Sequence, residues 1–307
     1  METFYPEGFI LDTPENATSC GSLRGLEEAR DKGKILEAIV SMCDYEHNMI
    51  VELEKIKGII PREEGAIGIS DGSVRDIALI SRVGKAVSFI VSDIKVEDGK
   101  VTPILSRKDA QEKCTKHYIQ QLTPGDIVNA RITHLENFGA FCDIGCGVVA
   151  LMPIDAISVS RISHPSDRFK CGDCIKAVVK SVDSLGRVSL SHRELLGTWE
   201  ENAGQFMQGE TVEGIVRTVE DYGIFIELAP NLAGLAEPKD NVEPGQKVSV
   251  YIKSIIREKM KVKLIIIDVF DADKTTAQLN YFIDSGHIDR WQYSPDGCRK
   301  MIETVFE

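Results

Sequence analysis

Short stretches in which every second residue is apolar recur along most of this chain, and Gly, Asp, Asn or Pro separates one stretch from the next. Such alternation is typical of strands with one buried face, because successive side chains of a strand point to opposite sides. In the middle of the chain it predicts five strands, with the sequences IVNARI, GAFCDI, VVALMP, CIKAVVKSV and RVSLS. A longer connection follows the third strand, as in small closed barrels.

The pattern is repeated later in the chain. A shift of 84 residues (222 − 138) lays NFGAFCDI at 137–144 on DYGIFIEL at 221–228, and so places Gly139 on Gly223. Further along, the shift falls to 73 residues (245 − 172), because the second copy lacks eleven residues of the connection that reads ISVSRISHPSDRFK in the first copy. Loops tolerate such deletions whereas packed strands do not, so the chain contains a repeated domain.

A weaker third copy precedes these two. KGKILEAIV at 32–40 resembles PGDIVNARI at 124–132, and LSRK resembles LSHR at the end of each copy. The sequence therefore predicts a mainly β protein of three tandem five-stranded OB-fold barrels, joined by short helical linkers and followed by a small helical C-terminal appendage. The predicted segments are an N-terminal arm (1–33), the three barrel units (34–107, 124–195 and 208–268) and a tail (269–307).

The linkers and the tail carry helix signals. KDAQEKCTKHYIQQL (108–122) and HRELLGTWEENAGQF (192–206) are rich in helix-forming residues and end near Pro or Gly. In the tail, TAQLNYFI (276–283) places its apolar residues on one helical face, and SPDGCRKMIETVF opens with a Ser-Pro helix start. We expect the tail to pack on the last barrel with Trp291 buried.

Two aromatic residues bracket a glycine in each of the two closely repeated barrels. They are Phe138 and Phe141 in the middle unit, and Tyr222 and Phe225 in the third. Residues three apart on a regular strand face opposite sides, so we expect the glycine to allow a bulge or a tight kink at the start of the strand that turns both rings to the outer face. An exposed ring pair is typical of a stacking platform for single-stranded nucleic acid. Packing residues are the alternative, and the repetition at one spacing favours the platform.

These units resemble S1-type RNA-binding domains, and the chain is similar to short forms of the bacterial ribosomal protein S1 family. The resemblance is carried by GDIVNARITHLENFGAFCDIG, ALMP, SHPSDRFKCGD and KSVDSLGRVSLSHR, and it extends over roughly 34–268. It implies an RNA face of two aromatic residues, a histidine after the third strand, and an Asp–Arg pair near the last two strands. In the middle unit this face is matched by Phe138, Phe141, Asp183 and Arg187.

The histidine of that face is missing from all three units, where Pro61, Pro153 and Glu237 stand in its place. In the third unit, Tyr222 and Phe225 match the two rings. Glu237 would repel phosphate, so the resemblance implies weaker binding by the third unit than by the middle one.

Basic residues lie near the predicted platform of the middle unit. Its long connection carries Arg161, Arg168 and Lys170, which we expect to reach an RNA backbone passing over the rings, although an ordinary solvated loop has the same composition. The whole chain has a net charge of −12, whereas the middle unit holds eight basic and eight acidic residues. A locally neutral unit in an acidic chain is favoured as the main RNA-binding unit.

In the third unit Lys259, Lys261 and Lys263 alternate with apolar residues. The alternation predicts that the three ammonium groups share the outer face, either as a solvent face or as a track for phosphates. The first unit lacks the ring pair, since CDYEHNMIVEL offers Tyr45 and His47 without a second ring in register. We predict a docking or structural role for this unit. Deletion of 1–110 should then abolish ribosome association and leave RNA affinity nearly intact.

The composition is that of a globular protein, with 43% hydrophobic and 27% charged residues. The first residues carry no signal-peptide pattern and the longest apolar run, LIIIDVF, is too short to span a bilayer, so we expect a cytoplasmic protein with no membrane partner. Cys142, Cys146, Cys171 and Cys174 have a spacing similar to that of four-thiolate zinc sites. Two of them fall in predicted strands, which favours reduced structural thiols and leaves zinc as the alternative.

Catalytic motifs are lacking: the sequence holds no phosphate-binding glycine loop, nucleophile elbow or HExxH-type spacing. We therefore expect no enzyme, no cofactor and no small-molecule substrate. The sequence predicts single-stranded RNA binding, with mRNA as the partner, by a ribosomal protein S1-like protein of the small ribosomal subunit. Two alternatives stay open: a protein-interaction scaffold, and an accessory RNA-binding subunit of an RNA-processing or transcription complex.

Overall fold

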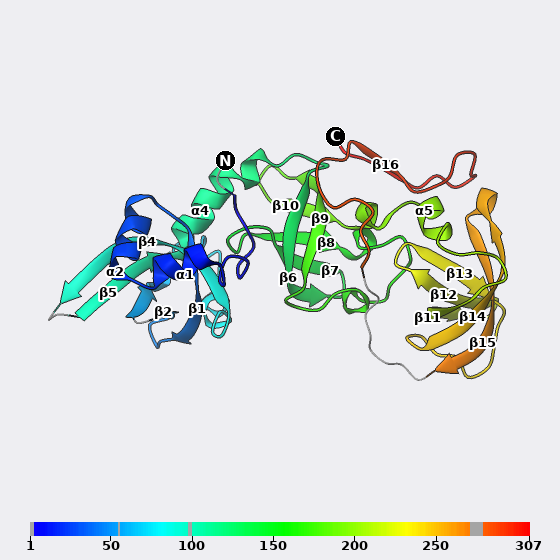
Figure 1. Ribbon diagram of the computed structural model, residues 1–307, viewed down its shortest axis with the longest axis horizontal. Coiled ribbons are helices and arrows are strands. Elements are labelled where there is room, and N and C mark those ends of the chain that lie inside the picture. Colours follow the sequence, from blue (N-terminus) through cyan, green and yellow to red (C-terminus); the bar gives the residue numbers. More distant parts are fainter. Residues whose placement is uncertain (1–2, 55, 98–99, 271–278) are drawn as a thin grey trace. The chain divides into compact units, whose positions relative to one another are not determined.

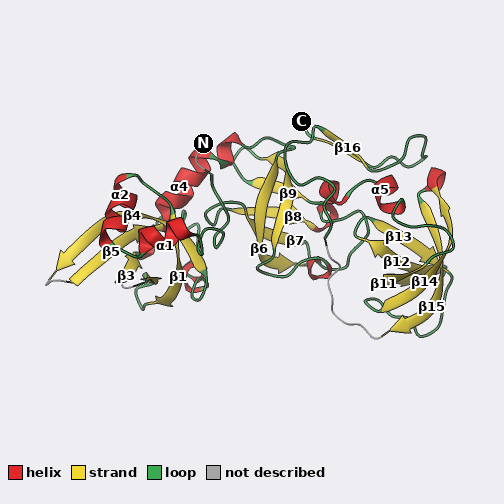
Figure 2. Cartoon of the chain, in the orientation of Figure 1, coloured by secondary structure: helices red, strands yellow, loops and turns green. Residues whose placement is uncertain are grey.

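A computed structural model describes residues 3–54, 56–97, 100–270 and 279–307 of the chain (Figure 1). By its internal contacts the chain divides into two compact units. The first unit comprises 1–122 with 129–131 and 143–149, and the second comprises 123–128, 132–142 and 150–307. Strands dominate both units, and the helices, all short, lie between strands or before the first strand in the sequence (Figure 2).

Three closed five-stranded barrels follow one another along the chain, so the predicted fold class is confirmed. In each barrel the third and fifth strands pair in parallel and close the sheet. The strands of the first barrel, in the order β1-β2-β3-β5-β4, are β1 (Leu36–Cys43), β2 (Met49–Leu53), β3 (Ile56–Ile60), β4 (Ala86–Glu97) and β5 (Lys100–Ser106). Its core is formed by alternate, inward-facing residues such as Leu36, Val51, Phe89 and Leu105.

The middle barrel follows the same plan, with the strand order β10-β8-β7-β6-β9. Its strands are β6 (Ile127–Glu136), β7 (Gly139–Asp143), β8 (Val149–Pro153), β9 (Cys174–Val182) and β10 (Val188–Ser191). The connection from β8 to β9 contains two 3-10 turns, η3 (Ile154–Ala156) and η4 (Pro165–Asp167), and the second is held by a capping box between His164 and Asp167.

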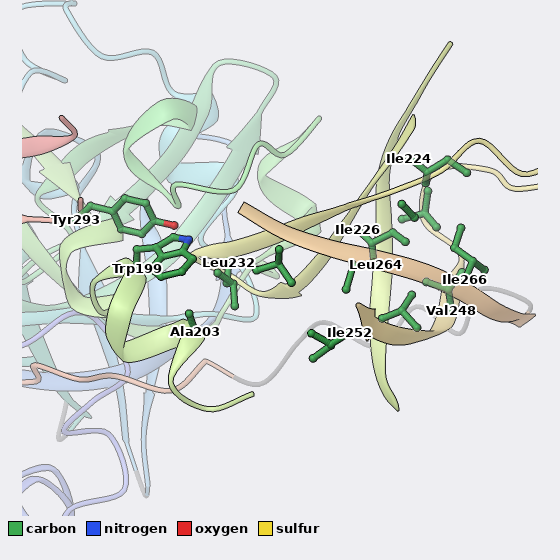
Figure 3. Packing of buried hydrophobic residues seen from close by; sticks show 14 of the residues in the cluster. Trp199, Ala203, Ile224, Ile226, Leu232, Val248, Ile252, Leu264, Ile266 and Tyr293 are labelled. Carbon is green, nitrogen blue, oxygen red and sulfur yellow. The ribbon is translucent and has the colours of Figure 1, made fainter. Parts of the chain in front are cut away.

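The third barrel has the order β11-β12-β13-β15-β14. Its strands are β11 (Thr211–Glu220), β12 (Gly223–Ala229), β13 (Leu232–Ala236), β14 (Lys247–Ile256) and β15 (Lys261–Phe270). Figure 3 shows its interior, where Ile224, Ile226 and Leu264 pack together and Trp199 lies beside Tyr293 at one side of the same cluster. The cluster also contains Val178 of the middle barrel, so the two barrels and the residues between them share one apolar core.

The helices are short and their ends follow from capping residues. In the arm, α1 (Pro14–Cys20) and α2 (Leu23–Asp31) begin after Thr13 and Ser22, whose hydroxyls accept hydrogen bonds from backbone N–H groups of the first turn. The other helices are α3 (Ile77–Ile80), α4 (Arg107–His117) and α5 (Trp199–Ala203), and the other 3-10 turns are η1 (Arg62–Glu64), η2 (Ile119–Gln121), η5 (Arg193–Leu196) and η6 (Arg257–Lys259). Helical linkers therefore lie where the sequence predicts them, although the second is broken into η5 and α5.

The tail differs from its prediction. Residues 279–307 form no helix; they contain β16 (Arg290–Gln292) and β17 (Glu303–Val305), which pair as a small antiparallel sheet. The first three residues of the predicted helix 276–283 lie outside the described residues. The predicted packing of the tail is confirmed, because Trp291, Tyr293 and Phe306 are buried in the apolar cluster that contains the core of the third barrel. Burial of these rings outweighs the local helix preference of the segment.

The tail also adds to the middle barrel. Ile127 N donates to Gly286 O over 3.1 Å, and Ile288 N donates to Gly125 O over 2.9 Å, which makes an isolated antiparallel bridge at Asp126 and His287. Beside this bridge, His287 Nδ1 lies 2.7 Å from Asp126 Oδ1.

In the first unit the arm is held by a buried ion pair. Arg107 Nε lies 2.6 Å from Glu7 Oε1, and Glu7 N donates to Asp143 Oδ2 over 2.7 Å. Burial, together with the negative charge of Glu7, raises the pKa of Asp143 to about 7. The arm is thus an integral part of this unit. Among the described residues, no helix combines the length and the apolar character needed to cross a bilayer.

Candidate nucleic-acid interface

The predicted ring pair of the middle barrel lies on its outer surface. Phe138 precedes β7 and is 56% exposed, while Phe141, on the strand itself, is half-buried. Their ring centroids are 5.9 Å apart and their planes meet at 89°. One ring therefore presents its edge to the other, and each keeps a surface turned away from the barrel core.

The third barrel repeats this arrangement. Tyr222 precedes β12 and is 68% exposed, Phe225 is half-buried on the strand, and the two centroids lie 6.1 Å apart at 86°. Two barrels of different sequence thus hold an aromatic pair in nearly the same geometry. Core packing does not require an exposed member, since an exposed ring gains little from the hydrophobic effect.

The glycine between the rings has a different role from the predicted one. A Cβ on Gly139 would lie 2.4 Å from Met152 O, and a Cβ on Gly223 would lie 2.6 Å from Ala236 O. Glycine is therefore needed for the close approach of a neighbouring strand. The register irregularity in the third barrel lies on the partner strand β11, between Val216 and Thr218, so the predicted bulge at Gly223 is wrong.

The Asp–Arg pair of the middle barrel is assembled in the turn between β9 and β10. Arg187 Nε lies 2.6 Å from Asp183 Oδ2, and the backbone N–H groups of Leu185 and Arg187 both donate to Asp183 Oδ1. The hydrogen bonds from the backbone and then from the side chain of Arg187 lower the pKa of Asp183. Asp183 therefore shapes the turn and orients Arg187, whose side chain is exposed.

The basic residues of the long connection separate into two kinds. Arg161 and Lys170 are exposed, as a phosphate contact requires. Arg168 is not available to RNA: its side chain is completely buried and its Nη1 and Nη2 lie 2.7 and 2.5 Å from the two carboxylate oxygens of Glu227 on β12. The prediction for Arg168 therefore fails, because this guanidinium is paired with a buried carboxylate of the next barrel.

The lysines of the third barrel lie at the start of β15. Lys261 and Lys263 are exposed on the strand, and Lys259 is exposed in the 3-10 turn that precedes it. Lys263 pairs with Leu235 of β13, which pairs in turn with Phe225. One ammonium group is thus two strands away from the ring pair. Glu237, which replaces the family histidine, is exposed and has Lys253 Nζ at 4.0 Å.

Another aromatic side chain stands beside the middle ring pair. The imidazole of His134, on β6, has its centroid 6.3 Å from that of Phe141 with the two planes inclined by 30°. No role is predicted for His134 from the sequence. Its position beside Phe141 follows from the pairing of β6 with β7. The 84-residue repeat alone does not specify that pairing.

The first barrel offers a different surface at the corresponding turn. Tyr45 is fully exposed between β1 and β2, and Asp76 lies near His47 Nδ1 (3.8 Å) and Arg62 Nε (2.7 Å). Within the described part of the chain, no group of three or more His, Cys, Asp and Glu side chains could hold a metal ion. Of the four cysteines with zinc-like spacing, Cys142 and Cys146 are buried whereas Cys171 and Cys174 are exposed.

The chain is similar in sequence to proteins of known family. Residues 121–193 match the family model described as the S1 RNA binding domain. The small ribosomal subunit protein bS1 of Staphylococcus aureus is 31% identical over 276 residues, which cover 82% of this chain and 68% of that protein. The bS1 protein of Staphylococcus epidermidis is 30% identical over 288 residues, or 86% and 70% of the two chains.

A solved structure of a multidomain protein with nucleic acid binding domains from Streptococcus pneumoniae covers 77% of this chain and 74% of its own, at 15% identity and a TM-score of 0.26. The relation to the two staphylococcal proteins extends over most of the sequence and over more than one barrel. The chain therefore belongs to the bacterial ribosomal protein S1 family.

Proposed function

We propose that this protein binds single-stranded RNA, with mRNA as the physiological ligand, as an S1-like protein of the small ribosomal subunit. The observation that carries the proposal is the repeated, outward-facing aromatic pair at Phe138 and Phe141 and at Tyr222 and Phe225. Its support is the match of 121–193 to an RNA-binding domain family and the relationship to proteins named for the small ribosomal subunit.

The aromatic pairs bind bases by stacking, and nearby cations bind the backbone. Stacking on an aromatic side chain contributes about 1–3 kcal/mol per base and is indifferent to sequence. The phosphate contacts in this proposal come from exposed basic side chains: Arg161, Lys170, Arg187, Lys259, Lys261 and Lys263. Because the chain carries a net charge of −12, only local groups of this kind can attract an RNA.

The central test is a titration of fluorescent single-stranded RNA of mixed sequence with the full chain. Phe138→Ala/Phe141→Ala should weaken binding about tenfold or more, since two stacked bases are lost. Tyr222→Ala/Phe225→Ala is the matched variant in the third barrel, and a smaller loss is expected there because Glu237 lies on that barrel. Binding by the wild type should weaken between about 50 and about 200 mM salt.

Two results would contradict the proposal. Unchanged affinity in both double variants, with far-UV circular dichroism and thermal unfolding as in the wild type, would make the rings packing residues. Binding of duplex and single-stranded RNA with equal affinity would exclude base stacking. Point variants are preferable to deletion of 1–110, because that deletion removes Glu7 and Arg107 from their contacts around Asp143 of the middle barrel.

Ribosome association is tested separately by co-sedimentation with small ribosomal subunits. The family relationship leads us to expect the wild-type chain in the subunit fraction. If ring-dependent RNA binding is found and the protein sediments alone, it acts on RNA away from the ribosome. Co-purification with a nuclease or a polymerase would then favour an accessory subunit of a processing or transcription complex.

A further inference from the structure

The outer face of the third barrel contains a row of side chains that are direct neighbours across four strands. Thr218 on β11 pairs with Phe225 on β12, which pairs with Leu235 on β13, which pairs with Lys263 on β15. The first two pairs are antiparallel, where such neighbours have Cβ atoms about 4.5–5.5 Å apart, and the third pair is parallel. The half-buried ring thus has a small hydroxyl residue on one side and, beyond a leucine, an ammonium group on the other.

The middle barrel has the same row with different ends. The 84-residue shift lays His134 on Thr218 and Phe141 on Phe225. At the other end, Ser189 pairs with Leu151 and takes the place of Lys263. The middle barrel has therefore exchanged the distant ammonium group for an imidazole that directly adjoins the ring pair.

The geometry of His134 is that of a surface ring held in place. Its side chain is 62% exposed, and its ring lies at 30° to the ring of Phe141, whereas Phe138 stands at 89° to Phe141. Its Nε2 lies 2.7 Å from Glu136 Oε1. Glu136 corresponds to Glu220 in the third barrel, so the carboxylate is common to both barrels and only the imidazole is new.

We propose that His134 is a third stacking residue of the middle barrel and takes one further base of the single-stranded RNA. This inference rests on the proposed function. Phe138 and Phe141 supply two aromatic surfaces, and His134 continues the second of them onto β6 at a small inclination, so that successive bases follow the row across the strands. Glu136 is a positioning residue: its bond to Nε2 holds the ring and leaves the ring face to the base.

An exposed histidine that belongs only to the solvent face would have the same burial and the same bond to Glu136. The two interpretations differ in what replaces the ring. If stacking is the role, His134→Thr copies the third barrel and should weaken binding about fivefold or more, while His134→Phe should bind within about twofold of the wild type. If the residue is merely solvated, His134→Thr should bind as the wild type does.

The reciprocal change tests the same point as a gain of affinity. In the Phe138→Ala/Phe141→Ala background, RNA binding depends on the third barrel. Thr218→His should then strengthen binding about threefold or more, because it places an imidazole beside Phe225 and Glu220 in the geometry of the middle barrel. Thr218→Val is the control for a change of side chain without a ring, and it should leave the affinity as it was.

The imidazole signals report the contact directly. The Cε1–H resonance of His134, assigned by its loss in His134→Thr, should shift upfield on addition of a short RNA, because a stacked base lies over it. A resonance that does not move, or His134→Thr binding as tightly as the wild type while Phe138→Ala/Phe141→Ala is weakened, overturns this inference alone. If Phe138→Ala/Phe141→Ala binds RNA as tightly as the wild type, the proposed function is overturned, and this inference with it.

Discussion

Glu227 is a buried carboxylate that serves two arginines. Arg168 comes from the long connection of the middle barrel and Arg217 from β11, where its Nε lies 2.8 Å from Glu227 Oε2. Removing one partner of such a group leaves the others as uncompensated buried charges, which costs far more than a surface pair is worth. The Arg168 side chain therefore acts on the stability of the protein rather than on RNA.

We predict that Glu227→Ala lowers the free energy of unfolding by about 3–5 kcal/mol, because both guanidinium groups lose their counter-charge. Arg168→Met should cost less, since Arg217 still neutralises Glu227. Urea unfolding of the full chain measures both. Lys170→Met, two residues from Arg168 and exposed, is the control and should change stability by less than about 0.5 kcal/mol. Equal stability of Glu227→Ala and the wild type would show that the triad is not buried in solution.

The imidazole of His287 and the carboxylate of Asp126 form a second informative pair, this one at the surface. The hydrogen bond to Asp126 is the main cause that raises the pKa of His287 above its usual 6.5. Burial works in the opposite direction at Asp126, but hydrogen bonds from Thr123 and from His287 lower the pKa of that carboxyl below its usual 3.8. Each ion thus stabilises the other.

The sign of the resulting pH dependence follows from these directions. The contribution of His287 is fully present below pH 6.5 and is lost as the pH rises through its higher folded-state pKa. That of Asp126 is present above pH 3.8 and is lost as the pH falls through its lower folded-state pKa. An NMR titration of His287 should give a pKa above 6.5, and Asp126→Asn should bring it back toward 6.5. A pKa of 6.5 or lower in the wild type would contradict the pairing.

At the scale of elements, the strands were predictable because two patterns in the sequence mark them. Alternation marks the buried face of each strand, and the repeat, at a shift of 84 and then 73 residues, supports the assignments in the middle and third barrels twice. The tail was not predictable in this way. Its helical periodicity is genuine, yet Trp291, Tyr293 and Phe306 gain more from burial in the apolar core of the second unit than a short isolated helix would gain from its own hydrogen bonds.

In the candidate site, too, some residues could be predicted from the sequence and others could not. The rings and the turn pair Asp183–Arg187 are recognisable from neighbours in sequence. The burial of Arg168 depends on Glu227, a partner 59 residues away, and the place of His134 depends on which strand lies beside β7. The spacing of residues in the sequence does not reveal such distant partners, because a surface arginine and a buried one can have the same sequence neighbours.

For the whole molecule, the two tryptophans provide a selective probe. Trp199 and Trp291 are the only tryptophans of the chain, and both lie in the apolar core of the second unit. We predict that Glu227→Gln lowers the urea midpoint measured by tryptophan fluorescence. Glu7→Gln, which breaks the buried pair with Arg107 in the first unit, should lower a far-UV circular dichroism transition and leave the fluorescence midpoint in place. A shift of the fluorescence midpoint by both variants would mean that the two units unfold as one.

The bridge between Gly125–Ile127 and Gly286–Ile288 has a consequence for synthesis on the ribosome. The two partners Asp126 and His287 are 161 positions apart. At about 5–20 residues per second, translation supplies the second partner about 8–30 s after the first. During that interval the nascent middle barrel has its aromatic pair in place but an open backbone edge at its entry. The barrel closes with its own five strands, but the backbone groups of Gly125 and Ile127 gain their partners only when residues 286–288 have been made. Until then this exposed edge is a place where a chaperone or a misfolded contact can act.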